Sequence, residues 1–186
     1  SNTQQGLTGI SFGNFLIKQV VEEIKRELPN VQTFVTLSPA PGFASWLNGE
    51  RAAETSPLID AATRAALDLL DTPGWADDAA RAEQVRAALL PLAAWYFLEA
   101  KGKRSQPRDP VARFHLGNGA RLERLNFLGD RSEKGLQQSY GLMVNYLYAL
   151  DKIEANHEAY AEKGKIAASP AVRKLLPSRI VAEAGA

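Results

Sequence analysis

Residues 8–43 decide the fold, and they read TGISFGNFLIKQVVEEIKRELPNVQTFVTLSPAPGF. From position 12 to position 28 apolar side chains recur at helical spacing, and the charged side chains fall mostly between them. The apolar stripe consists of Phe12, Phe15, Leu16, Val20, Ile24 and Leu28. This pattern predicts an amphipathic helix that ends at Pro29. The β-branched and apolar residues of 31–37 then favour a short buried strand.

The predicted strand ends in a turn, because Pro39, Pro41 and Gly42 follow it directly. Ser38 therefore lies where the chain leaves a sheet. The order loop, helix, strand indicates an α/β fold, and open α/β sheets bind ligands at the edge where their strands end.

The rest of the chain adds further helices and strands around this unit. We expect a helix over 62–70, a helix over 79–100 that is kinked at Pro91, a strand over 120–128, and a mostly helical segment over 153–176 broken at Pro170. The segment 132–149 fits either one helix or a helix followed by a strand at 146–148. The basic, proline-containing residues 101–108 read as a solvated surface loop, although such a loop beside a nucleotide could also meet a phosphate.

Length and composition limit the class of protein. The 186 residues are 45% apolar and 23% charged, which fits a single globular domain over 1–186. A net charge of +1 gives no overall attraction to nucleic acid or membranes, so any anion site is local. The chain has no cysteine, which excludes disulfides and thiolate chemistry. It also lacks a long apolar run and an SKL-type ending, so we expect a cytoplasmic protein.

The loop at the start of the predicted helix is a candidate anion site. Two glycines let its backbone approach a ligand closely, and the N–H groups at a helix start favour phosphate. The same pattern also fits a simple capping loop in which Ser11 or Asn14 closes the helix. The candidate binding residues are Thr8, Gly9, Ile10, Ser11, Phe12, Gly13 and Asn14.

Ser38 and His115 are the candidate catalytic residues. A serine before proline commonly bonds only to nearby backbone, and a histidine between apolar neighbours is commonly a core residue. Asn118 and Gly119 form a turn directly after His115, which places the imidazole at the end of an element. The other histidine, His157, lies in a polar helical stretch, and we expect it to be exposed to solvent.

Motifs along the whole chain resemble the catalytic domain of the malonyl-CoA decarboxylase family. They include TQQGL at 3–7, FLIK at 15–18, LSP at 37–39 with PGF at 41–43, and DPVA at 109–112. Further matches are FHL at 114–116, NGA at 118–120, GLM at 141–143, NY at 145–146, and Tyr148. The resemblance implies that Ser38 and His115 are the catalytic pair and that residues 8–14 hold the coenzyme A diphosphate.

The resemblance also implies a fold and a setting. The fold is a mixed sheet flanked by helices, like that of GNAT-type acetyltransferases, with a pyrophosphate loop at a helix N-terminus. Members of the family carry a helical N-terminal domain and earlier strands that these residues lack, so the chain resembles the later part of such a protein. The resemblance further implies a homo-oligomer that converts malonyl-CoA to acetyl-CoA. From the charge balance and the lack of a long apolar run, we expect neither nucleic acid nor a membrane as a partner.

The expected chemistry needs no metal or organic cofactor. Loss of CO2 from a malonyl thioester leaves an enolate on the thioester itself, so the protein has to place the carboxylate and deliver a proton. Ser38 would engage the carboxylate and His115 would protonate the carbon, with Asn118 and Tyr148 as candidates for orienting them. Two alternatives stay open: an acyltransferase on the same fold, and a non-catalytic protein that binds acyl-CoA.

Overall fold

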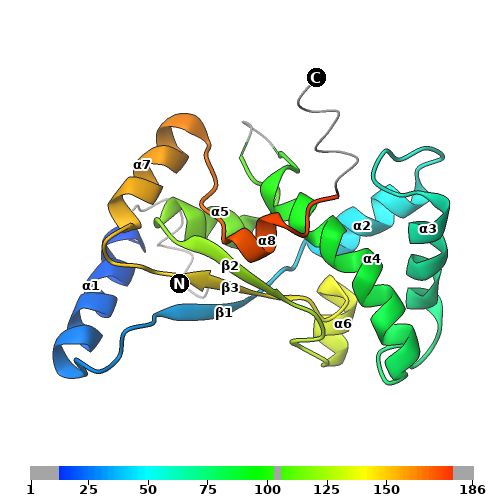
Figure 1. Ribbon diagram of the computed structural model, residues 1–186, viewed down its shortest axis with the longest axis horizontal. Coiled ribbons are helices and arrows are strands. Elements are labelled where there is room, and N and C mark those ends of the chain that lie inside the picture. The colour runs from blue at the N-terminus through cyan, green and yellow to red at the C-terminus, as the bar shows by residue number, and fades with distance from the viewer. Residues whose placement is uncertain (1–12, 103–105, 178–186) are drawn as a thin grey trace, which may run out of the picture.

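The computed structural model describes residues 13–102 and 106–177, and Figure 1 shows their arrangement. A small sheet lies in the middle of the view. The helices α2 (Phe43–Ala52), α3 (Ala61–Asp68), α4 (Ala79–Leu98) and α6 (Glu133–Ser139) gather at one end of it. The helices α1 (Gly13–Glu27) and α7 (Ile153–Lys163) lie at the other end, where Lys18 and Glu154 form an ion pair.

Three strands form the sheet in the order β1, β3, β2. They are β1 (Val35–Pro39), β2 (Arg121–Asn126) and β3 (Met143–Leu147), and both pairings are antiparallel. The expected mixed sheet is therefore not seen among these strands, and the only parallel contact described is an isolated bridge from Leu122 to Ala168. The cause is local. Tyr140 and Gly141 both adopt positive φ after α6, and the chain then runs back as β3 against β2.

Helix starts follow the sequence closely. A side-chain oxygen accepts a hydrogen bond from a first-turn backbone N–H in five of the described helices, as expected of N-cap residues. The caps are Asp60 of α3, Asp78 of α4, Asp109 of α5 (Pro110–Gly117), Ser132 of α6 and Ser169 of α8 (Pro170–Arg173). The short 3₁₀ helix η2 (Leu69–Asp71) follows α3.

Several expectations are confirmed and others are corrected. The first helix and the strand beginning near 120 are present, and 132–149 is a helix followed by a strand. The strand expected over 31–37 instead begins at Val35 and includes Ser38, and it is not buried as expected, because Val35 and Leu37 are 49% and 58% exposed. Pro170 begins α8 and does not break a helix, because proline suits the first helical position. Pro91 lies inside α4, which is one helix, and the kink expected at this residue stays a prediction. In α1 Val21 is buried and Val20 is exposed, as is Leu28 directly after the helix, so the described part of the predicted stripe was rotated.

One continuous core connects the sheet to the helices. Its largest fully buried side chains include Phe43, Tyr96, Phe97, Leu122 and Tyr146. The aromatic rings of Phe43, Trp46 and Tyr96 contact one another with centroids 4.9 to 5.8 Å apart. This cluster ties α2 to α4 directly after the turn that follows Ser38.

Candidate active site

Ser38 is the fourth of five residues in β1, and its side chain points to the covered face of the sheet. It is 6% exposed and pairs in register with the buried Val144 of β3. Alternation along a strand puts Thr36 on the same face, and the Ser38 and Thr36 hydroxyl oxygens are 3.0 Å apart. The serine therefore lies within the strand and one residue before its end, close to the expected position.

His115 lies in the last turn of α5 and reaches Ser38 across 77 residues of sequence. Its Nε2 is 3.0 Å from the Ser38 Oγ, and its Nδ1 is 2.7 Å from the hydroxyl of Tyr148. The imidazole also stacks on the ring of Tyr146, with centroids 4.3 Å apart and planes 19° from parallel. The ring is thus held on one face and at both nitrogens.

Burial sets the charge of this site. His115 is 7% exposed, and loss of solvation lowers its pKa from 6.5 to about 4. Burial also raises the pKa of Tyr148, so the phenol keeps its proton. A neutral imidazole has one N–H and one lone pair. Because each ring nitrogen faces a hydroxyl group, the pair Ser38 and Tyr148 can serve either tautomer.

Of the remaining predicted site residues, the structure brings Tyr148 alone into described contact with the imidazole. Asn118 instead caps the end of α5: its amide Nδ2 donates to the Phe114 carbonyl at 2.6 Å, and its Oδ1 is buried without a partner in the described part of the chain. Gly13 and Asn14 begin α1. The other loop residues, Thr8, Gly9, Ile10, Ser11 and Phe12, lie outside the described residues.

Sequence reasoning missed two groups that shape the site. Tyr146 lies beneath the imidazole with a buried hydroxyl that has no partner among the described atoms. Asp109 caps α5 with a carboxylate that is 0% exposed. The signal for Asp109 was present, since Asp followed by Pro marks a helix start. His157 is half-buried and bonds through Nδ1 to the Gly117 carbonyl at 2.7 Å, so the expectation of a solvent-exposed ring was wrong.

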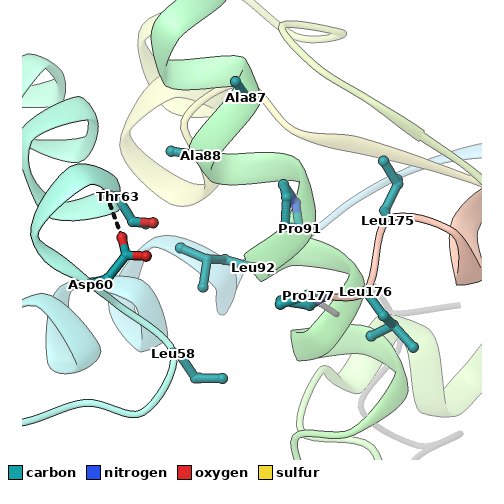
Figure 2. A pocket seen from close by; sticks show the side chains of 10 residues that line it. All are labelled: Leu58, Asp60, Thr63, Ala87, Ala88, Pro91, Leu92, Leu175, Leu176 and Pro177. Carbon is teal, nitrogen blue, oxygen red and sulfur yellow. Dashed lines mark hydrogen bonds between the residues drawn. The ribbon is translucent and has the colours of Figure 1, made fainter. Parts of the chain in front are cut away.

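A separate hollow of about 450 Å³ lies between α3, α4 and the segment after α8 (Figure 2). Leucine, alanine and proline side chains line most of it. Asp60 lies at its edge, where its carboxylate accepts from the Thr63 N–H at 2.8 Å. Ser38, His115 and Tyr148 do not line this hollow, so the candidate active site and the hollow are distinct features.

No three His, Cys, Asp or Glu side chains in the described segments are grouped as metal ligands would be. None of the described helices combines the length and the apolar character that crossing a bilayer requires.

Several known proteins that are similar to this chain are malonyl-CoA decarboxylases. The chain is 37% identical over 190 residues to the mitochondrial malonyl-CoA decarboxylase of Anser anser anser, covering 92% of this chain and 38% of that protein. The mitochondrial enzyme of Rattus norvegicus is 37% identical over 194 residues, covering 95% and 39%. The chain therefore spans about two fifths of the length of these relatives.

Solved structures agree. A malonyl-CoA decarboxylase from Rhodopseudomonas palustris is 72% identical with a TM-score of 0.92, covering 95% of this chain and 40% of that one. The protein from Agrobacterium vitis is 59% identical with a TM-score of 0.88, covering 94% and 43%. The model of the malonyl-CoA decarboxylase C-terminal domain matches residues 1–185. The chain thus belongs to the malonyl-CoA decarboxylase family.

Proposed function

We propose that this chain carries the active site of an enzyme that converts malonyl-CoA to acetyl-CoA and CO2. The observation that carries the proposal is the 3.0 Å contact between the Ser38 Oγ and the His115 Nε2, found in a chain of the malonyl-CoA decarboxylase family. The two side chains come from distant segments, and both are buried. A buried polar pair of this kind is well suited to acid–base work.

In the proposed reaction, the thioester group of the substrate accepts the electron pair that the departing CO2 leaves behind. When the carboxylate leaves as CO2, the electron pair of the broken C–C bond moves into the thioester and forms an enolate. The thioester therefore serves as the electron sink, and in this proposal neither a metal nor an organic cofactor takes part. The protein has to bind the carboxylate, lower the water content of the pocket and supply one proton.

Ser38 engages the malonyl carboxylate in this scheme. Its hydroxyl can donate to a carboxylate oxygen, and its 6% exposure leaves few waters to compete. Thr36, whose hydroxyl lies 3.0 Å away, keeps the Ser38 side chain in place.

His115 protonates the enolate carbon. The free imidazole is neutral near pH 7, because burial lowers its pKa to about 4. The arriving carboxylate brings a negative charge to the ring, and a nearby opposite charge raises the pKa of an imidazole. The ring then takes a proton from solvent on binding and gives the Nε2 proton to carbon after CO2 has left. Tyr148 orients the ring through Nδ1, and Asn118 holds the end of α5.

The proposal extends to the surroundings of the pair. Thr8, Gly9, Ile10, Ser11, Phe12, Gly13 and Asn14 bind the coenzyme A diphosphate through backbone N–H groups at the start of α1, in a GNAT-like arrangement. Residues 1–186 act as one catalytic domain of a cytoplasmic homo-oligomer. Sedimentation of the purified protein tests the oligomer, and cell fractionation tests the compartment.

The reaction is tested with the full-length gene product that contains this chain. After treatment with chelator, it should convert malonyl-CoA to acetyl-CoA and CO2 in equal amounts. Activity that vanishes with EDTA and returns with a metal ion would refute the cofactor-free chemistry. Transfer of an acyl group to an amine without release of CO2 would instead assign the chain to the acyltransferases.

A further inference from the structure

A buried carboxylate at the start of α5 has no part in the chemistry proposed above. Asp109 is 0% exposed, and burial raises its pKa. Its Oδ1 accepts from the Ala112 N–H at 2.9 Å, which caps α5, and its Oδ2 lies 3.4 Å from the hydroxyl of Tyr96 on α4. Burying a carboxyl group costs free energy unless hydrogen bonds replace the lost contacts with water.

Tyr96 connects this carboxylate to the turn that follows Ser38. Its ring packs against Phe43 and Trp46 of α2, with centroids 5.4 and 4.9 Å away. A Cβ placed on Gly42 would lie 2.8 Å from the Tyr96 hydroxyl oxygen and 4.0 Å from Asp109 Oδ2. Gly42 is four residues after Ser38, so the phenol fits against the backbone of the segment that carries the serine.

These contacts connect α5, which carries His115, to the turn that follows Ser38. Asp109 precedes His115 by six residues, about 9 Å along a helix. A small rotation of α5 about its start therefore shifts the imidazole at its far end. Catalysis is sensitive to such shifts, since a misplacement of about 1 Å can lower a rate about 10²-fold.

We infer that Asp109 is a positioning residue. With Tyr96 it fixes α5 against the turn at Gly42, and it thereby holds the His115 imidazole at hydrogen-bonding distance from Ser38. The inference rests on the proposed function only for its kinetic consequence, because the geometric consequence can be measured without turnover.

Four variants of the full-length gene product test this role. Tyr96→Phe removes one hydroxyl and keeps the aromatic packing, and it should lower kcat about tenfold with KM within about twofold of wild type. Asp109→Ala should lower kcat about 10²-fold. Asp109→Asn keeps an oxygen for the cap and a polar group for Tyr96, so it should regain most of this loss. Asp78→Ala removes the carboxylate cap of α4 and is the matched control, with kcat expected near that of wild type.

Two further measurements separate positioning from general stability. Asp109→Ala in a His115→Asn background should cause no further loss of kcat, because the residue acts through the imidazole. A crystal structure of Tyr96→Phe should show the Ser38 Oγ and His115 Nε2 farther apart than hydrogen-bonding distance. An unchanged distance, an unchanged kcat in Tyr96→Phe or additive losses in the double variant would each overturn the inference. A wild-type protein that releases no CO2 would refute the proposed function but not the positioning role of Asp109. That role would still be tested by the distance between the Ser38 Oγ and the His115 Nε2 in the Tyr96→Phe structure.

Discussion

At His115, burial and reactivity impose opposite requirements. An imidazole enclosed by Tyr146, Tyr148 and the sheet is held in one orientation, yet it loses the solvation that would keep it charged. The free site is therefore neutral, and we propose that the negative charge of the substrate makes the ring a proton donor. The sequence pointed to both Ser38 and His115, but it gave no indication of the ring stack that orients the imidazole.

The lowered pKa of His115 predicts how folding stability depends on pH. Its folded pKa near 4 lies below the unfolded value of 6.5, so the stabilisation is complete above pH 6.5 and is lost as the pH falls toward 4. We expect this residue to account for a loss of about 2 kcal/mol between pH 7.5 and pH 4.5. Urea unfolding of wild type and His115→Asn at both values measures it. Equal losses in the two proteins would contradict the buried neutral ring.

Separate substitutions of the catalytic pair should distinguish their roles. Ser38→Ala should slow CO2 release itself, whereas His115→Asn should leave protonation of the enolate to solvent. In both variants kcat should fall at least about 10²-fold, while the affinity for malonyl-CoA stays within roughly tenfold, or about 1.4 kcal/mol. In deuterated buffer, label should still enter the methyl group.

His157→Asn is the control for this pair, since the only hydrogen bond described for its ring goes to the Gly117 carbonyl. Its kcat should stay close to that of wild type. A near-normal kcat in His115→Asn would show that His115 is not the essential proton donor and that its role is structural.

The element that delivers His115 is short, and this is why sequence periodicity missed it. The helix α5 has eight residues, too few for an apolar stripe to stand out. Its boundaries were nevertheless encoded: Asp109 and Pro110 begin it, and Asn118 with Gly119 ends it. Start and stop signals are thus more informative for this short helix than hydrophobic spacing, although no helix was predicted here. In α1 the spacing predicted the helix correctly but placed its buried side one residue away from Val21.

Gly119 should be essential for the connection from α5 to β2. Its φ is +76°, and an added Cβ would lie 2.2 Å from the Ile153 carbonyl oxygen. Gly164 also has positive φ, at +61°, but its surroundings are open. Gly164→Ala should cost about 1 kcal/mol for the backbone alone, and Gly119→Ala should cost clearly more. Denaturant unfolding measures the free energy of unfolding of both variants. Equal losses of stability would show that the protein relieves the contact with Ile153 at no cost.

Gly9, and Gly13 at the start of α1, should matter for binding more than for catalysis. A β-branched residue at Gly9 or Gly13 would keep the backbone N–H groups away from a diphosphate. We expect Gly9→Val and Gly13→Val to weaken coenzyme A binding while binding of a pantetheine thioester without phosphates changes little. Calorimetry with both ligands measures the difference. Wild-type affinity for coenzyme A in folded variants would mean that the loop only caps the helix.

At the scale of the whole molecule, the active site depends on contacts between distant segments. Ser38 and His115 are brought together because β1 pairs with β3, which is more than a hundred residues away, and α5 leads directly into β2 on the other side of β3. Local patterns predicted these strands but neither their order nor their antiparallel register. The reversal at Tyr140 and Gly141 accounts for the antiparallel pairing of β3 with β2. The pairing of β1 with β3 joins segments far apart in the sequence, and neither pairing can be read from strand propensity.

The outer side of β1 predicts how this chain behaves when it is produced alone. Among the described residues β1 has only one neighbouring strand, and its Val35 and Leu37 side chains are 49% and 58% exposed. An apolar edge strand invites pairing with other chains, and a lysine there opposes it. The isolated 186-residue chain should therefore self-associate, and Leu37→Lys should reduce this. Leu28→Lys, at a similarly exposed leucine outside the sheet, is the control. Sedimentation velocity over a concentration series measures the effect, and equal behaviour of both variants would show that β1 is not the contact.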